Sequence, residues 1–298
     1  MKILDSTARR ILDRLMLAIR PSATATRQGG HRSPVLASGV EFADHRAYVP
    51  GDDFRRIDWK AFARHGQLTL RQFEEERDAR VYVMLDVSGS MSRGDPPKIE
   101  IAKRLAASFA YVGMRQFDRP VVLPFGTDVD LGDVRPLRGS GDLPELDRFL
   151  SECTADGPTQ FPQAVRTLAS RFKSRGLVVV ISDLLTMEGF PEGFRTLGAL
   201  GHQLRVVRVR CKEDERPDLD GEFELHDAET GETVRLRVSK DLIRAYQKEI
   251  ADHVEKVSDA ARRVGGRFVE VAVDAPVDTM LRAAFGGLDA KTKGAAAR

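Results

Sequence analysis

One segment of this 298-residue chain joins a strand pattern to a cluster of oxygen-bearing side chains: Arg80-Val81-Tyr82-Val83-Met84-Leu85-Asp86-Val87-Ser88-Gly89-Ser90-Met91-Ser92. Its first half is almost continuously apolar, which is typical of a strand covered on both faces of a sheet. Asp86 stands near the end of that strand, and Ser88 and Ser90 follow at alternate positions. Open α/β sheets bind ligands beyond the carboxyl ends of their strands, so this segment predicts a site as well as a strand.

Outward from this segment, strand-length apolar runs alternate with stretches of helical periodicity. The predicted strands are Val81–Val87, Val121–Phe125, Leu177–Ile181, Leu204–Val209 and Phe268–Val273. The predicted helices are Ile99–Phe117, Leu143–Leu150, Phe161–Phe172, Phe190–Leu200, Leu242–Val264 and Val277–Phe285. This alternation predicts an α/β fold with a doubly wound, mostly parallel sheet over residues 80–288.

The remaining segments have other patterns. Residues 1–21 carry apolar side chains at helical spacing and predict an amphipathic helix, docked on its own protein or on a partner, with a membrane surface as the alternative. Residues 22–79 predict a small β-rich subdomain. About residues 222–238, two alternating runs flank a turn and predict an inserted hairpin. Residues 289–298 are small and polar and predict a flexible tail.

Composition excludes several classes of protein. Hydrophobic residues make up 42% and charged residues 31%, as in globular domains, and 47 basic against 45 acidic residues leave a net charge of +2. We therefore expect no nucleic-acid partner and no membrane contact. Only Cys153 and Cys211 are present, which excludes a disulfide scaffold and a Cys-rich zinc site. With no secretory or membrane-spanning pattern in the sequence, we expect a cytoplasmic protein.

Two more segments supply oxygen-bearing side chains of the same kind. Thr159 lies in a loop just before a predicted helix, and Asp183 ends a predicted strand. Because neighbouring parallel strands end at one edge of a sheet, Asp86, Ser88, Ser90, Thr159 and Asp183 are predicted to converge on one cation. Carboxylate and hydroxyl oxygens suit Mg²⁺ or Mn²⁺. The alternative is that Asp86 and the serines only cap the following helix.

These five residues resemble the metal-ion-dependent adhesion site (MIDAS) of von Willebrand factor A domains, where an Asp-x-Ser-x-Ser motif is completed by a Thr and an Asp. The resemblance implies a von Willebrand A-like domain with a Rossmann-like sheet. It also implies a bound Mg²⁺ or Mn²⁺ with one position open to a carboxylate of a partner protein. Asp183 is followed by Leu184-Leu185 and not by the Gly often found there, which affects the expected loop geometry.

A second resemblance lies before the first strand, in the segment Gly39-Val40-Glu41-Phe42-Ala43-Asp44-His45-Arg46-Ala47-Tyr48-Val49-Pro50-Gly51-Asp52-Asp53-Phe54-Arg55-Arg56-Ile57-Asp58-Trp59. It resembles the signature of the domain of unknown function 58 (DUF58) family. Members commonly occur with MoxR-type AAA+ ATPases and are thought to act as their adaptors, so the resemblance implies such a partner. The carboxylates and arginines of the signature predict structural ion pairs, with a surface for the ATPase as the alternative, and Trp59 predicts a core anchor.

These patterns together predict a non-enzymatic, metal-dependent protein-interaction module, an adaptor or co-chaperone of a MoxR-type ATPase or a binder of an acidic client protein. One alternative is a Mg²⁺-dependent phosphohydrolase with Asp86 as nucleophile, similar to the haloacid dehalogenase type. Those enzymes need a second Asp where this chain has Ser88, and a later Lys that the sequence does not identify. Another alternative is an interaction module whose site stays empty. No P-loop or HExxH motif is present, and the sequence indicates neither the client nor the oligomeric state.

Overall fold

The computed structural model describes residues 3–19, 42–47, 62, 69–73, 80–116, 119–126, 136–137 and 139–286. Within these residues a five-stranded sheet has the order β4-β3-β5-β6-β9, and every neighbouring pair is parallel. Its strands are β3 Arg80–Asp86, β4 Val121–Phe125, β5 Gly176–Ser182, β6 Gln203–Arg210 and β9 Arg267–Ala272. The predicted α/β fold with a doubly wound parallel sheet is confirmed.

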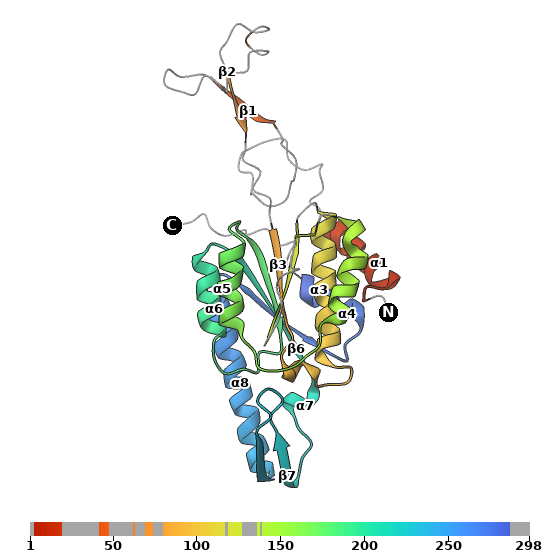
Figure 1. The fold of residues 1–298 in the computed structure, drawn as a ribbon, viewed down its shortest axis with the longest axis vertical. Coiled ribbons are helices and arrows are strands. Elements are labelled where there is room, and N and C mark those ends of the chain that lie inside the picture. The colour runs from red at the N-terminus through yellow and green to blue at the C-terminus, as the bar shows by residue number, and fades with distance from the viewer. Residues whose placement is uncertain are drawn as a thin grey trace.

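Helices cover both faces of this sheet (Figure 1). One face packs against α1 Ser6–Ile19, α3 Lys98–Arg115, α4 Leu143–Glu152 and α9 Val277–Phe285. The other face packs against α5 Phe161–Arg171, α6 Phe190–Ala199 and α8 Lys240–Arg263. A short 3-10 turn, η3 Ser140–Asp142, precedes α4. Each of the six helices predicted after residue 80 is present, with ends within a few residues of those expected.

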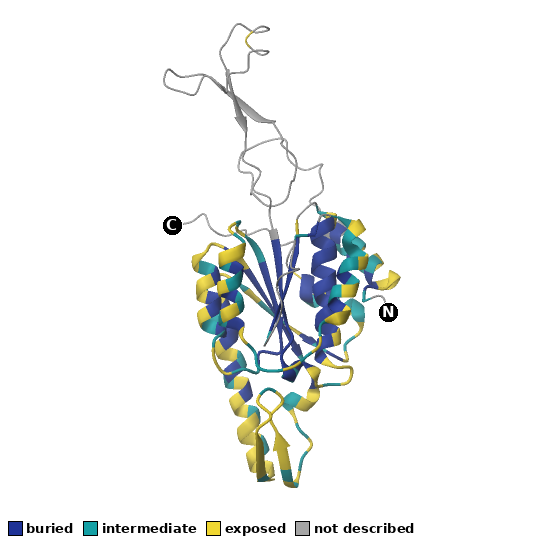
Figure 2. Ribbon diagram, in the orientation of Figure 1, coloured by how far each residue is buried: buried dark blue, intermediate teal, exposed yellow. Residues whose placement is uncertain are grey.

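Strand β3 contributes to the core on both sides of the sheet. Val83 and Leu85 pack among the residues of one hydrophobic cluster, and Tyr82 and Met84 pack in the other. All four side chains are buried, and Figure 2 shows the central strands mostly buried. Because successive side chains of a strand point to opposite faces, a strand between two helical layers must be apolar at every position. The continuous apolar run in the sequence follows from this placement.

The winding of the sheet reverses at β3. The chain passes from β3 to β4 on one side and then returns to place β5 on the other side of β3. The gap between the carboxyl ends of β3 and β5 is therefore the topological switch point, where open α/β sheets bind ligands.

Helix α1 packs against α3 and α9 of the main domain. Its apolar stripe of Ala8, Leu12 and Met16, together with Leu4 just before the helix, is buried in the same cluster as those helices. The Tyr111 hydroxyl also donates a hydrogen bond to Asp13 Oδ1 at 3.0 Å. Of the placements expected for this amphipathic helix, the structure has the one on the body of its own chain.

The predicted hairpin insertion is present as β7 Gly221–His226 paired with β8 Thr233–Val238. It extends beyond the carboxyl end of the sheet beside the first turns of α8 (Figure 1). Most of its side chains are exposed, and Val238 is its buried residue (Figure 2). A one-turn helix that the sequence did not predict, α7 Lys212–Glu215, lies between β6 and this hairpin.

Little of the predicted β-rich subdomain falls on described residues. Strands β1 Phe42–Ala47 and β2 Thr69–Phe73 pair antiparallel. Apart from Phe62, the rest of residues 22–79 lies outside the described residues, and this includes Trp59 and the predicted ion pairs around Asp52. The predicted tail 289–298 also lies outside them. Among the helices of the described ranges, none combines the length and the hydropathy needed to cross a bilayer.

Candidate metal centre

The carboxyl ends of β3 and β5 carry the two predicted aspartates. Asp86 is the last residue of β3, and Asp183 directly follows β5. These strands are adjacent and parallel at the switch point. Both residues are buried, with exposures of 1% and 2%. The topology therefore brings the two carboxylates to one edge of the sheet.

The carboxylate of Asp86 is held by its own chain on both oxygens. Oδ1 accepts a hydrogen bond from the Ser88 backbone N–H at 2.9 Å, and Oδ2 accepts one from Ser182 Oγ at 2.5 Å. Ser182, the last residue of β5, was not among the predicted site residues. Its hydroxyl joins the two strand ends and fixes the orientation of Asp86.

Ser88 and Ser90 begin the turn that follows β3, the 3-10 helix η2 Gly89–Ser92. Their hydroxyl oxygens lie 3.2 Å apart. Ser88 stands at the N-cap position of η2, but its side chain makes no capping hydrogen bond. This geometry does not support the alternative in which the serines serve as helix caps, and it places the two hydroxyls within hydrogen-bonding distance of each other.

Thr159 reaches the same region on a neighbouring loop. That loop is joined to the turn after β3 by two backbone hydrogen bonds, from Gly89 N–H to Gly157 O at 2.8 Å and from Asp156 N–H to Val87 O at 2.9 Å. Thr159 makes two hydrogen bonds with Glu229, from its N–H to Oε2 at 3.2 Å and from its Oγ1 to Oε1 at 3.3 Å. Glu229 belongs to the turn of the inserted hairpin, so a third segment of the chain meets the site.

Asp183 is paired with a buried lysine that the sequence did not reveal. Lys98, the first residue of α3, has no exposed surface and donates to Asp183 Oδ2 at 2.7 Å. It also forms a short ion pair with Asp214 of α7. Burial opposes the charge of this ammonium, but the two carboxylates outweigh it and raise the pKa of Lys98. The site thus contains a cation of its own.

The turn after β5 is strained, and its contacts hold Asp183 in place. Leu184 has a φ of 60°, in the left-handed region that costs a non-glycine residue about 1–3 kcal/mol. Its N–H donates to Ser182 Oγ at 2.9 Å, and its carbonyl accepts from His253 Nε2 at 2.8 Å. Leu185 N–H donates to Asp183 Oδ1 at 3.2 Å. Leu184 therefore adopts the conformation for which Gly is preferred, and burial of its side chain in the core offsets the cost.

Burial and a neighbouring carboxylate affect the protonation of Asp86. Burial, and then the charge of Asp183, raise the pKa of Asp86 to about 7, although the hydrogen bonds from Ser182 and Ser88 act in the opposite direction. Two neighbouring buried carboxylates cannot both ionise without a compensating charge. A divalent cation would supply that charge, since Lys98 interacts with Asp183 and not with Asp86 in the hydrogen bonds described above.

The donor set fits a hard divalent cation. Two carboxylates and three hydroxyls offer oxygen only, which Mg²⁺ and Mn²⁺ prefer. In the part of the chain that the structure describes, no group of three or more His, Cys, Asp or Glu side chains is placed to hold a metal. The candidate set contains two such side chains, and its other oxygens are hydroxyls. A cation held here would retain water or accept further carboxylates.

Four residues around the candidate site were not predicted from the sequence, and the reason differs from one to the next. Ser182 ends a strand as many serines do, and Lys98 follows two prolines with no recognisable motif. Asp214 lies in a run of charged residues, which is typical of a solvent-exposed surface. Glu229 carries a detectable signal, because an acidic residue at the tip of an insertion next to an α/β sheet can reach the carboxyl edge of that sheet.

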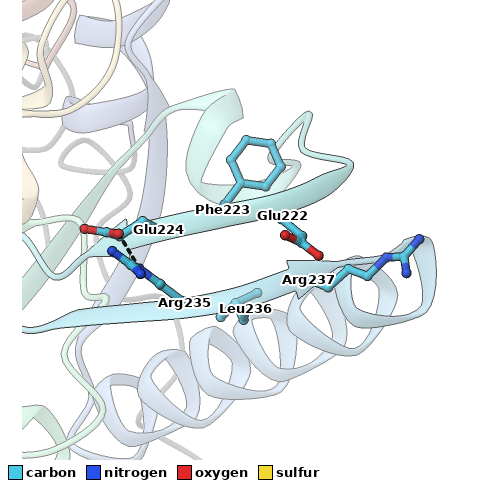
Figure 3. Close-up of a pocket in the computed structure, with 6 residues that line it drawn as sticks. All are labelled: Glu222, Phe223, Glu224, Arg235, Leu236 and Arg237. Carbon is cyan, nitrogen blue, oxygen red and sulfur yellow. Dashed lines mark hydrogen bonds and ion pairs between the residues drawn. The ribbon is translucent and has the colours of Figure 1, made fainter.

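A shallow pocket lies on the hairpin and not at the strand ends (Figure 3). It is lined by Glu222, Phe223, Glu224, Arg235, Leu236 and Arg237. Arg235 Nε pairs with Glu224 Oε2 at 2.5 Å across the two strands. Every lining residue comes from β7 or β8, so this pocket is separate from the five candidate ligands.

The chain is similar to uncharacterized proteins and to distant solved structures. Uncharacterized protein Rv1480 of Mycobacterium tuberculosis is 24% identical over 265 residues, which are 87% of this chain and 83% of that protein. An aerotolerance-related membrane protein from Bacteroides fragilis has 18% identity and a TM-score of 0.45, over 71% of this chain and 98% of the other. The SpRpn10 VWA domain has 11% identity and a TM-score of 0.42, over 68% and 94%.

One of the similar structures is described with an occupied adhesion-site motif. Proximal thread matrix protein 1 from the mussel byssus, described with a zinc-occupied MIDAS motif, has 13% identity and a TM-score of 0.35, over 44% of this chain and 38% of the other. The family model described as protein of unknown function DUF58 matches residues 44–256, which include most of the Gly39–Trp59 signature and all five candidate ligands. The chain belongs to the DUF58 family.

Proposed function

We propose that this chain is a non-enzymatic protein-interaction module whose binding depends on Mg²⁺ or Mn²⁺. Asp86, Ser88, Ser90, Thr159 and Asp183 would hold the cation, directly or through water. The observation that supports this most is the placement of two buried, mutually repelling carboxylates at the switch point of the sheet, beside hydroxyls from adjoining loops.

The chain's own residues prepare such a site. Ser182 and the Ser88 N–H orient Asp86, while Lys98 and the Leu185 N–H orient Asp183. A cation bound there provides a positive centre that attracts a carboxylate of a partner protein. Because the carboxylates are already fixed, little ordering is needed when such a complex forms.

The partner we propose is a MoxR-type AAA+ ATPase, for which the chain would act as adaptor or co-chaperone, or a client protein that presents an acidic residue. This partnership is what the resemblance of Gly39–Trp59 to the DUF58 signature implies. Membership of the DUF58 family supports it, since residues 44–256 match the family model.

Ser90→Ala should abolish Mg²⁺ binding while the fold stays intact. Ser90 is partly exposed and donates one hydroxyl to the site, so its loss removes a candidate ligand and little packing. In a thermal-unfolding titration, Mg²⁺ at a hundred times its Kd should stabilise the wild type by about 2.7 kcal/mol and the variant much less. Ser92→Ala is the matched control, because Ser92 Oγ donates to Gly89 O within the same turn. Equal stabilisation of wild type and Ser90→Ala would count against the site.

The partner is tested by affinity capture from the native lysate, with Mg²⁺ or with EDTA, using wild type, Ser90→Ala and Ser92→Ala as bait. We expect mass spectrometry to identify a AAA+ ATPase with wild type and Ser92→Ala in Mg²⁺ only. Recovery of the ATPase in EDTA and with every variant would show that the chain binds the ATPase without the metal. Recovery of no ATPase under any condition would reject the adaptor role.

The phosphohydrolase alternative gains one observation from the structure, since Lys98 lies next to Asp183. However, Lys98 is fully buried and neutralised by two carboxylates, and Ser88 occupies the place of the second Asp. We expect no Mg²⁺-dependent hydrolysis of p-nitrophenyl phosphate above the level of the Asp86→Asn variant. Hydrolysis that Asp86→Asn eliminates would favour the enzyme.

A further inference from the structure

We infer that the hairpin turn Asp227–Glu232 is a built-in occupant of the metal site, and that Glu229 takes the place intended for a partner's carboxylate. This inference rests on the proposed function, because it concerns the open side of that site. It assigns a role to the insertion, and it makes withdrawal of the turn a condition of partner binding.

Glu229 is directed at a candidate ligand. Its two carboxylate oxygens accept hydrogen bonds from the N–H and the Oγ1 of Thr159, at 3.2 and 3.3 Å. Glu229 therefore lies beside one of the five residues that would hold the cation. In metal sites of this kind an acidic side chain is the group that an oxygen-preferring cation would bind next.

The turn also lies directly against the loop that carries the serines. A Cβ atom added at Gly89 would meet the carbonyl oxygen of Ala228 at 2.1 Å and its carbon at 2.9 Å. No side chain can be accommodated at that distance, so the close approach requires glycine at position 89. Contact with Gly89 on one loop and with Thr159 on another places the turn across both parts of the site.

The turn is held by hydrogen bonds of its own. Asp227 Oδ1 accepts hydrogen bonds from the N–H groups of Glu229 and Thr230, both at 2.8 Å, and these bonds lower the pKa of Asp227. Gly231 has a φ of 73°, which closes the turn at little cost. Glu229 is thus presented by a formed loop, and docking requires little additional ordering.

The strands behind the turn are loosely attached to the body. Leu225 and Val234 form a cross-strand pair and remain 39% and 54% exposed. Moving a hairpin that buries so little apolar surface costs little free energy. A partner carboxylate with more contacts of its own can therefore displace the turn. To do so, the partner must bind the site with a more favourable free energy than Glu229 does.

The test is a calorimetric titration of the full chain with Mg²⁺, without and with excess acetate, for wild type, Glu229→Ala and Glu232→Ala. Glu232→Ala removes the same charge from the same turn at an exposed position. We expect Glu229→Ala to bind Mg²⁺ about tenfold more weakly, as loss of a supporting ligand does. Acetate should restore that affinity by entering the vacated place, and it should change neither wild type nor Glu232→Ala.

Backbone amide exchange gives a second readout. The Thr159 amide should exchange faster in Glu229→Ala than in wild type and Glu232→Ala. Unchanged Mg²⁺ affinity in Glu229→Ala, or equal loss in Glu232→Ala, would overturn the inference and leave the metal site standing. Absence of Mg²⁺ binding by wild type would reject the proposed function itself, so the two failures are distinguishable.

Discussion

Lys98→Met should lower the free energy of unfolding of the metal-free protein by about 3–5 kcal/mol, the usual cost of removing one partner from a buried ion pair. Lys98 has no exposed surface, and its ammonium is shared by Asp183 and Asp214. Without it, two carboxylates lose their counter-charge at the same edge of the sheet. Chemical denaturation in EDTA measures the loss.

The matched control for that variant is Lys103→Met on the same helix. Lys103 is also largely buried, but its partner Glu100 is half exposed and the two are 3.2 Å apart within one helical turn. We expect this change to cost about 1 kcal/mol or less. Mg²⁺ should recover more stability in Lys98→Met than in wild type, because the cation then replaces the positive charge that pairs with the Asp183 carboxylate in wild type. Equal destabilisation by both substitutions would refute the special role of Lys98.

Asp183→Asn should eliminate Mg²⁺ binding and also reduce stability by about 2 kcal/mol, as loss of a charged hydrogen-bond partner does. Stability is affected because Asp183 is also one of two counter-ions for a buried ammonium. Asparagine preserves the shape of the side chain and an acceptor for the Leu185 N–H.

Asp156→Asn serves as the control for that experiment. Asp156 lies in the loop that carries Thr159, and its carboxylate accepts only a local, exposed hydrogen bond from the Gly157 N–H among the bonds described here. Calorimetry should show Mg²⁺ binding by Asp156→Asn and none by Asp183→Asn. Calorimetric binding of Mg²⁺ by Asp183→Asn with wild-type affinity would exclude Asp183 as a ligand, whatever its effect on stability.

The parts of this fold that could be predicted from sequence are those that obey local rules. Strand β3 and strand β5 are uniformly apolar because each lies between two helical layers, and that burial leaves a direct mark on composition. The ends of these strands then locate Asp86 and Asp183 without any knowledge of packing. The hairpin could also be predicted from the sequence, since the alternation of side chains around Gly231 is a local pattern.

What could not be predicted depends on contacts between distant segments. Lys98 and Asp183 are 85 residues apart, and Asp86 and Ser182 are 96 apart. Neither residue of such a pair lies in a sequence pattern that identifies its partner. The docking of Glu229 on Thr159 also depends on how an insertion folds back on the sheet. Local patterns predicted where a site would lie, and tertiary contacts determine what already occupies it.

The packing of α1 on α3 and α9 affects the order in which the chain can fold during synthesis. This helix is synthesised before the sheet, yet one of the two helices it packs against, α9, belongs to the last part of the described chain. Contacts between such distant segments form late, because a long loop must close first. Until α9 has been synthesised, the apolar stripe of α1 remains partly exposed. General chaperones bind exposed apolar surface of this kind. A nascent chain stalled before residue 277 should therefore be bound by chaperones through α1.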